Sequence, residues 1–151
     1  MSVFKEDIDT RDKLSFMNFI VKIFIDGACQ PNPGLGGVGV HIILNESEER
    51  YSRPLKNIVT NNIAEYEALI LSLKLILDKD ITAKEIQIFS DSKLICMQFN
   101  NQWKCKDAKL LPLLKQAIEL HSRIKSPLNL SLIPREENFV ADKLAKIAIL
   151  S

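Results

Sequence analysis

Nineteen acidic residues occur in the chain, and four of them stand where the surrounding pattern is apolar or helical. Asp26 ends the first apolar run, and Asp91 directly follows a later one. Glu65 and Asp142 fall in the first turns of two predicted helices. Carboxylates gathered at one place repel one another and raise one another's pKa unless a cation lies between them. If the fold brings these four acids together, they are candidates for a metal site.

Each acid also has a structural alternative. The Asp26-Gly27 pair is typical of a turn, and Asp91 has the residue type of a helix N-cap. Glu65 follows an asparagine by three residues, as in a capping box, and Asp142 would complement a helix dipole. Convergence of the four in the fold would favour a metal site over these alternatives.

Apolar runs and their periodicity predict the elements that position the acids. Strands are predicted over residues 19–25, 38–44, 48–55, 86–89 and 128–133, and helices over 62–77, 109–124 and 138–150, with one more helix beginning after Ser90. Three strands followed by strands alternating with helices predict an α/β domain with a five-stranded mixed sheet flanked by helices. The first and fourth strands are the most apolar, so we expect them side by side at the sheet centre, and the polar third strand near an edge.

Oxygen-only ligands suit Mg²⁺ or Mn²⁺ better than zinc, which prefers histidine and cysteine. Two such ions about 4 Å apart form a site that hydrolyses phosphodiesters by in-line displacement. The three cysteines, Cys29, Cys96 and Cys105, include no C-x-x-C pair and fit neither a disulfide framework nor a zinc site. They predict reduced thiols in a cytoplasmic protein.

The composition predicts one globular domain. The chain has 151 residues, 46% of them hydrophobic, and a formal net charge of +1. That balance excludes an intrinsically disordered chain and means that a nucleic-acid partner would need a local basic patch. No apolar run approaches the roughly 18 residues of a membrane span. We expect residues 1–17 to be an N-terminal extension without a signal-peptide pattern, and residues 18–151 to form a monomeric domain.

Four segments resemble, in order, the signature segments of type 1 ribonuclease H. They are IFIDGACQPNPGLGGVGV, TNNIAEYEALILSL, IFSDSKLICMQ and PREENFVADKLA. The resemblance covers residues 19–150 and implies a ribonuclease H-like fold. It also implies an endoribonuclease that hydrolyses the RNA strand of RNA/DNA hybrids with two Mg²⁺ or Mn²⁺ ions, leaving 3′-hydroxyl and 5′-phosphate ends.

The resemblance further implies roles for single residues. The catalytic metal ligands would be Asp26, Glu65, Asp91 and Asp142, with Asp26 bridging both ions. Gly27, Asn61 and Asn62 match positions that contact RNA 2′-hydroxyls and bases, which distinguish RNA from DNA. Thr60 matches a position that holds a phosphate of the DNA strand.

Trp103 is the only tryptophan of the chain. It belongs either to the core or to a surface beside the DNA strand. Lys104, Lys106 and Lys109 give that stretch a local positive charge suited to a phosphate backbone. The chain passes quickly from Trp103 to the next predicted helix, so the basic protrusion of some family members is expected to be shortened or absent.

The loop before Asp142 departs from the family pattern. Many members carry a histidine there, whereas residues 133–138 contain none. Arg135 or Glu136 is expected to take its place. His41 and His121 lie in a predicted strand and a predicted helix, where a structural role is expected. Two alternatives to the hybrid-specific enzyme stay open: a non-catalytic nucleic-acid-binding module on the same fold, and an enzyme that also cleaves double-stranded RNA.

Overall fold

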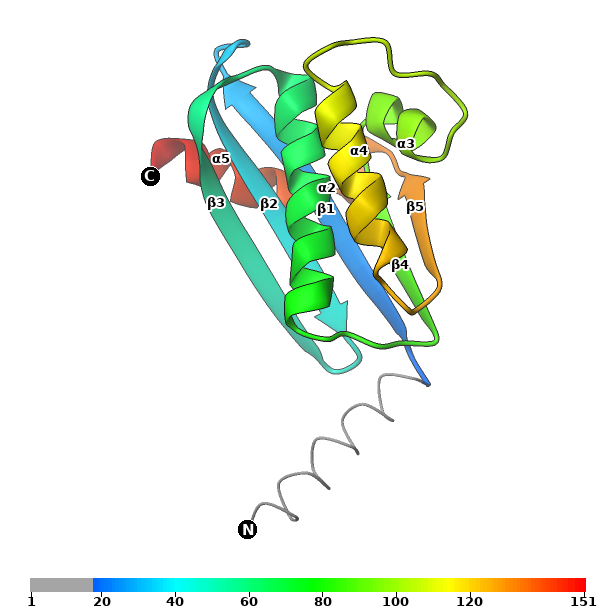
Figure 1. The fold of residues 1–151 in the computed structure, drawn as a ribbon. Helices are drawn as coiled ribbons and strands as arrows, with labels where there is room; N and C mark the ends of the chain where they lie inside the picture. Colours follow the sequence, from blue (N-terminus) through cyan, green and yellow to red (C-terminus); the bar gives the residue numbers. More distant parts are fainter. Residues whose placement is uncertain (1–17) are drawn as a thin grey trace.

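A five-stranded sheet in the order β3-β2-β1-β4-β5 forms the middle of the domain (Figure 1). The computed structural model describes residues 18–151, so the predicted extension of residues 1–17 lies outside the described residues. The strands are β1 (Ile20–Gln30), β2 (Gly34–Leu44), β3 (Ser47–Val59), β4 (Glu85–Ser90) and β5 (Leu128–Leu132). β1 pairs antiparallel with β2 and parallel with β4. The predicted mixed sheet, the adjacency of the first and fourth strands, and the edge position of the third are confirmed.

Helices cover both faces of this sheet. The helical elements are α2 (Asn61–Asp78), α3 (Lys93–Phe99), α4 (Leu111–Ser122), the short 3₁₀ helix η1 (Arg135–Glu137) and α5 (Phe139–Leu150). α2 packs on β1 and β2 with α4 beside it, and α5 lies behind the sheet against β1, β2 and β3 (Figure 1). Within residues 18–151, none of the helices has the length and apolar character that crossing a membrane requires.

The core lies between the sheet and α2. Alternate residues of β1, Val21, Ile23 and Ile25, are buried to 1% exposure or less. They join Leu69 and Leu73 of α2 in one apolar cluster. Because strand side chains alternate between faces and helix side chains recur every three to four residues, these two patterns lock β1 and α2 into one relative position.

β1 runs further than the sequence predicts. Asp26 pairs with Gly39 in the middle of the β1–β2 ladder, and the strand continues to Gln30. The expectation that the strand ends in a turn at Asp26-Gly27 is therefore wrong. Gly27 is needed for another reason: a Cβ atom on it would lie 2.1 Å from the carbonyl carbon of Ala64. A glycine permits this close approach of α2 to β1.

α5 approaches β2 just as closely. A Cβ atom on Gly39 would lie 2.3 Å from the carbonyl oxygen of Ala141, and one on Gly37 would lie 2.4 Å from that of Ala145. The helix is also tied to the edge strand, because the Ser52 hydroxyl donates a hydrogen bond of 2.6 Å to the Leu144 carbonyl. The position of α5 relative to the sheet is thus set by backbone contact.

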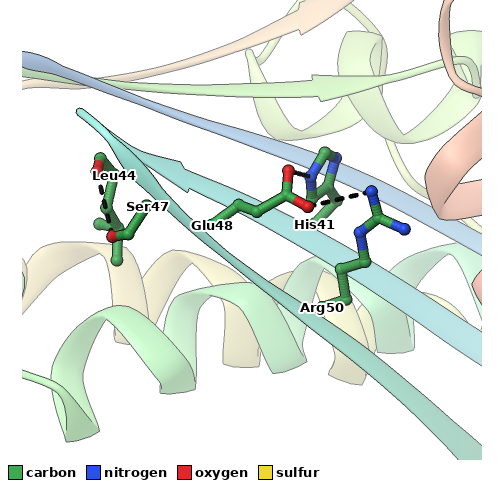
Figure 2. A network of polar contacts seen from close by, with 5 residues as sticks. All are labelled: His41, Leu44, Ser47, Glu48 and Arg50. Atoms are coloured by element: carbon green, nitrogen blue, oxygen red, sulfur yellow. Dashed lines mark hydrogen bonds and ion pairs between the residues drawn. The ribbon is translucent and has the colours of Figure 1, made fainter.

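The β2–β3 hairpin carries a polar network of its own (Figure 2). His41 Nε2 lies 2.9 Å from one Glu48 carboxylate oxygen, and Arg50 Nη2 lies 3.0 Å from the other. The Ser47 hydroxyl donates to the Leu44 carbonyl at 3.2 Å where the hairpin turns. His41 is 7% exposed, so the structure agrees with a structural role for it.

Candidate active site

Three of the four predicted acids meet in the structure. Asp26 lies in β1, Glu65 in α2, and Asp91 directly after β4. One carboxylate oxygen from each lies within 4.8 Å of the others. The parallel pairing of β1 with β4 and the packing of α2 on β1 bring them together. The convergence expected from the sequence is therefore present for these three residues.

The fourth acid, Asp142, stands at the side of this cluster. It lies in the first turn of α5, as predicted, and lines the same cleft as the other three. Its Oδ2 atom lies 3.0 Å from Nζ of Lys146, one turn further along α5. Lys146 also lines the cleft. Lys146 thus competes with a cation for the Asp142 carboxylate, which the family resemblance implies to be a metal ligand.

Burial controls the electrostatics of Asp26 and Glu65. Burial, together with the nearby charges of Asp91 and Asp142, raises the pKa of Asp26 to about 7, although the Glu65 contact opposes the shift. Burial and the charge of Asp26 raise the pKa of Glu65 well above its usual range. Clustered oxygen ligands that repel one another are typical of sites for hard divalent cations. The donor set therefore fits Mg²⁺ or Mn²⁺.

The contacts of Glu65 and Asp91 exclude the capping roles that their residue types also allow. Glu65 does not cap its own helix: Thr60 is the N-cap of α2, its Oγ1 accepting from the Ile63 amide at 3.2 Å. Because α2 begins at Asn61, Glu65 lies beyond its first turn, which corrects the prediction.

The Glu65 carboxylate instead accepts a hydrogen bond of 2.6 Å from the Gly27 amide of β1. Asp91 is not a cap either, because Ser92 is the N-cap of α3. The helix-dipole alternative for Asp142 is compatible with its place in the first turn of α5.

A groove leads away from the acids. The cleft that contains them shares Asn32, Asn61 and Asn62 with a second cavity. That cavity is also lined by Thr60 and by residues 107–110, which include a lysine. Asn61 is fixed at the junction: its Oδ1 accepts from the Cys29 amide at 3.3 Å, and its own amide donates to Asn32 Oδ1 at 3.2 Å.

Trp103 and Lys104 lie on the exposed loop between α3 and α4. Trp103 is 42% exposed, and Lys93 Nζ lies 5.7 Å from the centre of its ring. The alternative of a core tryptophan is therefore wrong. Residues 100–110 contain no helix, in agreement with the expected loss of the basic protrusion. Arg135 lines the acid cleft, whereas Glu136 is exposed on η1 and does not line it.

Sequence reasoning missed Lys146, Asn32 and Asn138. Lys146 had a signal, because it follows Asp142 by four residues, the spacing of a helical ion pair. Asn32 and Asn138 had no signal for their contacts between elements: Asn32 Oδ1 accepts from the Asn61 amide, 29 residues away, and Asn138 Nδ2 donates to the Ile25 carbonyl, 113 residues away.

Comparison with known proteins agrees with this geometry. Residues 24–148 match the family described as "Reverse transcriptase-like". Ribonuclease H of Actinobacillus pleuropneumoniae is 31% identical over 141 residues, which cover 84% of this chain and 88% of that protein. The chain belongs to the type 1 ribonuclease H family. The resemblance and the ribonuclease H-like fold predicted from the four segments are confirmed.

A second relative is longer than this chain. The bifunctional protein Rv2228c of Mycobacterium tuberculosis is 35% identical over 136 residues, which cover 85% of this chain but 35% of that protein. The chain thus spans about a third of the length of this relative. The solved structure of LC11-RNase H1 in complex with an RNA/DNA hybrid has a TM-score of 0.78 and 31% identity, and the match covers 87% of this chain and 99% of that one.

Proposed function

We propose that this chain is an endoribonuclease that hydrolyses the RNA strand of RNA/DNA hybrids and leaves 3′-hydroxyl and 5′-phosphate ends. The gathering of Asp26, Glu65 and Asp91 within 4.8 Å at one end of a groove carries the proposal. A domain that only binds nucleic acid gains nothing from carboxylates that repel both one another and the phosphates of the ligand. The non-catalytic alternative is therefore disfavoured.

The identity of the substrate is supported by relatives of known name. LC11-RNase H1 was solved with an RNA/DNA hybrid, and the Actinobacillus relative is named ribonuclease H. The groove of this chain offers polar side chains beside the acids, as reading of 2′-hydroxyls requires. Because the Gly27 amide already donates to Glu65, we assign the RNA contacts chiefly to Asn61 and Asn62.

Two Mg²⁺ or Mn²⁺ ions are the proposed cofactors, with Asp26, Glu65, Asp91 and Asp142 as their ligands and Asp26 shared. Such ions, when bound, lower the pKa of water and stabilise negative charge on a phosphoryl group. The Asp26 and Glu65 carboxylates would supply a negative site whose place is fixed by β1 and α2, whereas the Lys146 ion pair opposes the use of Asp142 as a ligand.

Other residues would position the nucleic acid. Arg135 lines the cleft and carries a permanent charge, so it can contact a phosphate but cannot accept a proton. Trp103 and Lys104, exposed on the α3–α4 loop, are the proposed contacts to the DNA strand, with Thr60 near a DNA phosphate. Their failure to line the acid cleft agrees with contacts to the strand that is not cut.

The deciding experiment is incubation of the protein with end-labelled RNA/DNA hybrid, double-stranded RNA and double-stranded DNA, each with Mg²⁺, Mn²⁺ or EDTA. We expect cleavage of the RNA in the hybrid, dependent on the metal and abolished in Asp91→Asn. Cleavage of the double-stranded RNA as well would establish the broader alternative. Equal cleavage of all-DNA duplex, or an Asp91→Asn variant as active as the parent, would refute the proposal.

We also propose a monomer in the cytoplasm. The three cysteines are free in the structure, which is compatible with a reducing compartment. Size-exclusion chromatography with light scattering and cell fractionation would test the two statements.

A further inference from the structure

Asn138 is a polar residue that is almost completely buried, with 1% of its surface exposed, where η1 meets α5. An asparagine before a helix usually caps it by accepting a hydrogen bond from one of the first backbone amides. The Asn138 side chain makes no capping bond. Its Nδ2 group donates instead to the Ile25 carbonyl at 2.8 Å and to Asp91 Oδ2 at 3.1 Å.

These contacts connect the elements that carry three of the four acids. Ile25 directly precedes Asp26 in β1, and Asp91 is contacted through its own carboxylate. The Asn138 carbonyl accepts from the Asp142 amide at 3.1 Å, in the first turn of α5. That last contact is the ordinary first hydrogen bond of a helix. The two side-chain contacts have no such local cause, because their partners lie 113 and 47 residues away, and they point to the site itself.

The orientation of the amide group follows from its partners. Both the Ile25 carbonyl and the Asp91 carboxylate accept hydrogen bonds, so the NH₂ group must face them. The Oδ1 atom then points elsewhere, and among residues 18–151 it is buried without a hydrogen-bond partner. An unpaired buried carbonyl lowers stability. A residue that served only stability would not leave a buried carbonyl unpaired. The unpaired Oδ1 is explained if this position requires both N–H donors of the amide group.

We propose that Asn138 is a positioning residue that holds the Asp91 carboxylate against β1 in the orientation needed to bind a divalent cation beside Asp26. The inference rests on the proposed function, because it assigns Asp91 a metal. Residues that orient a metal ligand through a hydrogen bond commonly change metal affinity or activity by roughly 10- to 100-fold when they are replaced.

The test compares two substitutions that remove an amide donor. Asn138→Leu keeps the branched shape and removes the donor without adding charge. Asn100→Leu is the control for loss of an amide donor: Asn100 Nδ2 also donates to a backbone carbonyl, that of Leu130 at 2.9 Å, but Asn100 is exposed at the end of α3 and does not line the acid cleft. Mg²⁺ affinity is measured by calorimetry without substrate, and kcat and KM are measured on an RNA/DNA hybrid.

We expect Asn138→Leu to weaken Mg²⁺ binding and lower kcat by at least about tenfold, while KM for the hybrid stays within about twofold of the parent. Asn100→Leu should match the parent in all three quantities. A residue that only supports the fold would lower the melting temperature and leave the Mg²⁺ affinity of the folded fraction unchanged. An Asn138→Leu variant with parental Mg²⁺ affinity and kcat would overturn the inference.

A measurement on the parent protein does not depend on whether a variant folds. In a ¹⁵N-labelled sample titrated with Mg²⁺, the side-chain NH₂ signals of Asn138 should shift together with the Asp91 backbone amide, and those of Asn100 should stay in place. A shift at Asp91 without one at Asn138 would overturn the inference and leave the proposed function intact. A parent that neither binds Mg²⁺ nor cleaves the hybrid would overturn both.

Discussion

The acidic site divides into an inner and an outer pair. Asp26 and Glu65, the inner pair, are 6% and 8% exposed and lie within the long elements β1 and α2. Asp91 and Asp142, the outer pair, lie at the end of a strand and the start of a helix, where they are half-buried. A backbone amide, that of Gly27, binds the inner pair through Glu65. Side chains hold the outer pair: the Asn138 amide contacts Asp91, and a lysine contacts Asp142.

This difference separates two requirements of a metal site. The inner pair supplies negative charge at a place fixed by the fold, and desolvation of that charge lowers the stability of the protein without metal. In the proposed metal site, the outer pair would supply ligands whose orientation depends on a few side-chain contacts. We therefore expect substitutions of the inner pair to affect stability and activity in opposite directions, and substitutions around the outer pair to affect mainly metal binding and turnover.

Asp26→Asn should have the largest effect. Loss of the central ligand removes several kcal/mol of transition-state stabilisation, which corresponds to about a thousandfold or more in kcat. The same change should raise the melting temperature of the metal-free protein, because it removes a buried charge beside Glu65. Cleavage assays and thermal unfolding in EDTA test both effects. Loss of activity accompanied by loss of metal-free stability would contradict the role given to the inner pair.

Stability without metal should fall as the pH rises. The folded-state pKa of Asp26, about 7, lies above its ordinary value of 3.8, so between these values the folded protein binds more protons than the unfolded chain. Its free energy of unfolding should therefore decrease from about pH 4 to about pH 7, by on the order of a few kcal/mol. Urea unfolding in EDTA across this range tests the slope.

Two comparisons sharpen this measurement. Asp26→Asn should flatten the slope, whereas Glu119→Gln, which removes an exposed carboxylate on α4, should retain it. Saturating Mg²⁺ at pH 7.5 should restore stability to the parent, because a ligand that binds only the folded state stabilises it. A parent whose stability in EDTA increases over this pH range would show that the inner pair is not desolvated.

Arg135→Ala should lower kcat by roughly fivefold, the effect of losing about 1 kcal/mol of phosphate contact. Because an arginine stays protonated, the parent at saturating Mg²⁺ should show no separate step near pH 6.5 in its profile of kcat against pH. Bound cations would keep the Asp26 carboxylate ionised across this range. His41→Ala and His121→Ala should leave the shape of that profile unchanged, although His41→Ala should reduce stability through loss of its contact with Glu48 (Figure 2). A limb of the profile that disappears in His121→Ala would place that histidine at the site.

Lys146→Ala should have the smallest effect. Helical ion pairs four residues apart contribute about 0.3–0.5 kcal/mol, so freeing Asp142 should tighten Mg²⁺ binding by roughly twofold. Lys143→Ala, which removes a charge from the same helix, is the matched control for a general change in potential. Calorimetry at low salt can detect the difference, and equal effects of the two variants would show that the Lys146 contact does not compete with the metal.

Much of the fold could be predicted because each element carries its own periodicity. The apolar alternation of β1 and the helical spacing of α2 are local patterns, and the sheet order follows from the relative hydrophobicity of the strands. The predicted boundaries of elements are wrong where one sequence pattern has two possible structural causes. Asp26-Gly27 resembles a turn, but the glycine permits contact with Ala64, a residue of another element.

The sequence singled out the four acids of the candidate site but not the residues that contact them. The four carboxylates stand out because each occurs beside an apolar run or at a helix start. The partner of Glu65 is an amide 38 residues away, and that of Asp91 is the side chain of Asn138, 47 residues away. Such contacts depend on how the elements pack, and no local sequence pattern encodes them.

The glycines of β2 have a consequence for genetics. A methyl group at Gly39 would occupy the space of the Ala141 carbonyl, so alanine there must move α5 outward, and Asp142 moves with it. Such an allele alters no functional side chain. The size of the defect would depend on the stability of α5 packing at a given temperature. Gly39→Ala is therefore a candidate temperature-sensitive mutation, active at low and inactive at high temperature. Substitutions on the opposite side of α5 should suppress it.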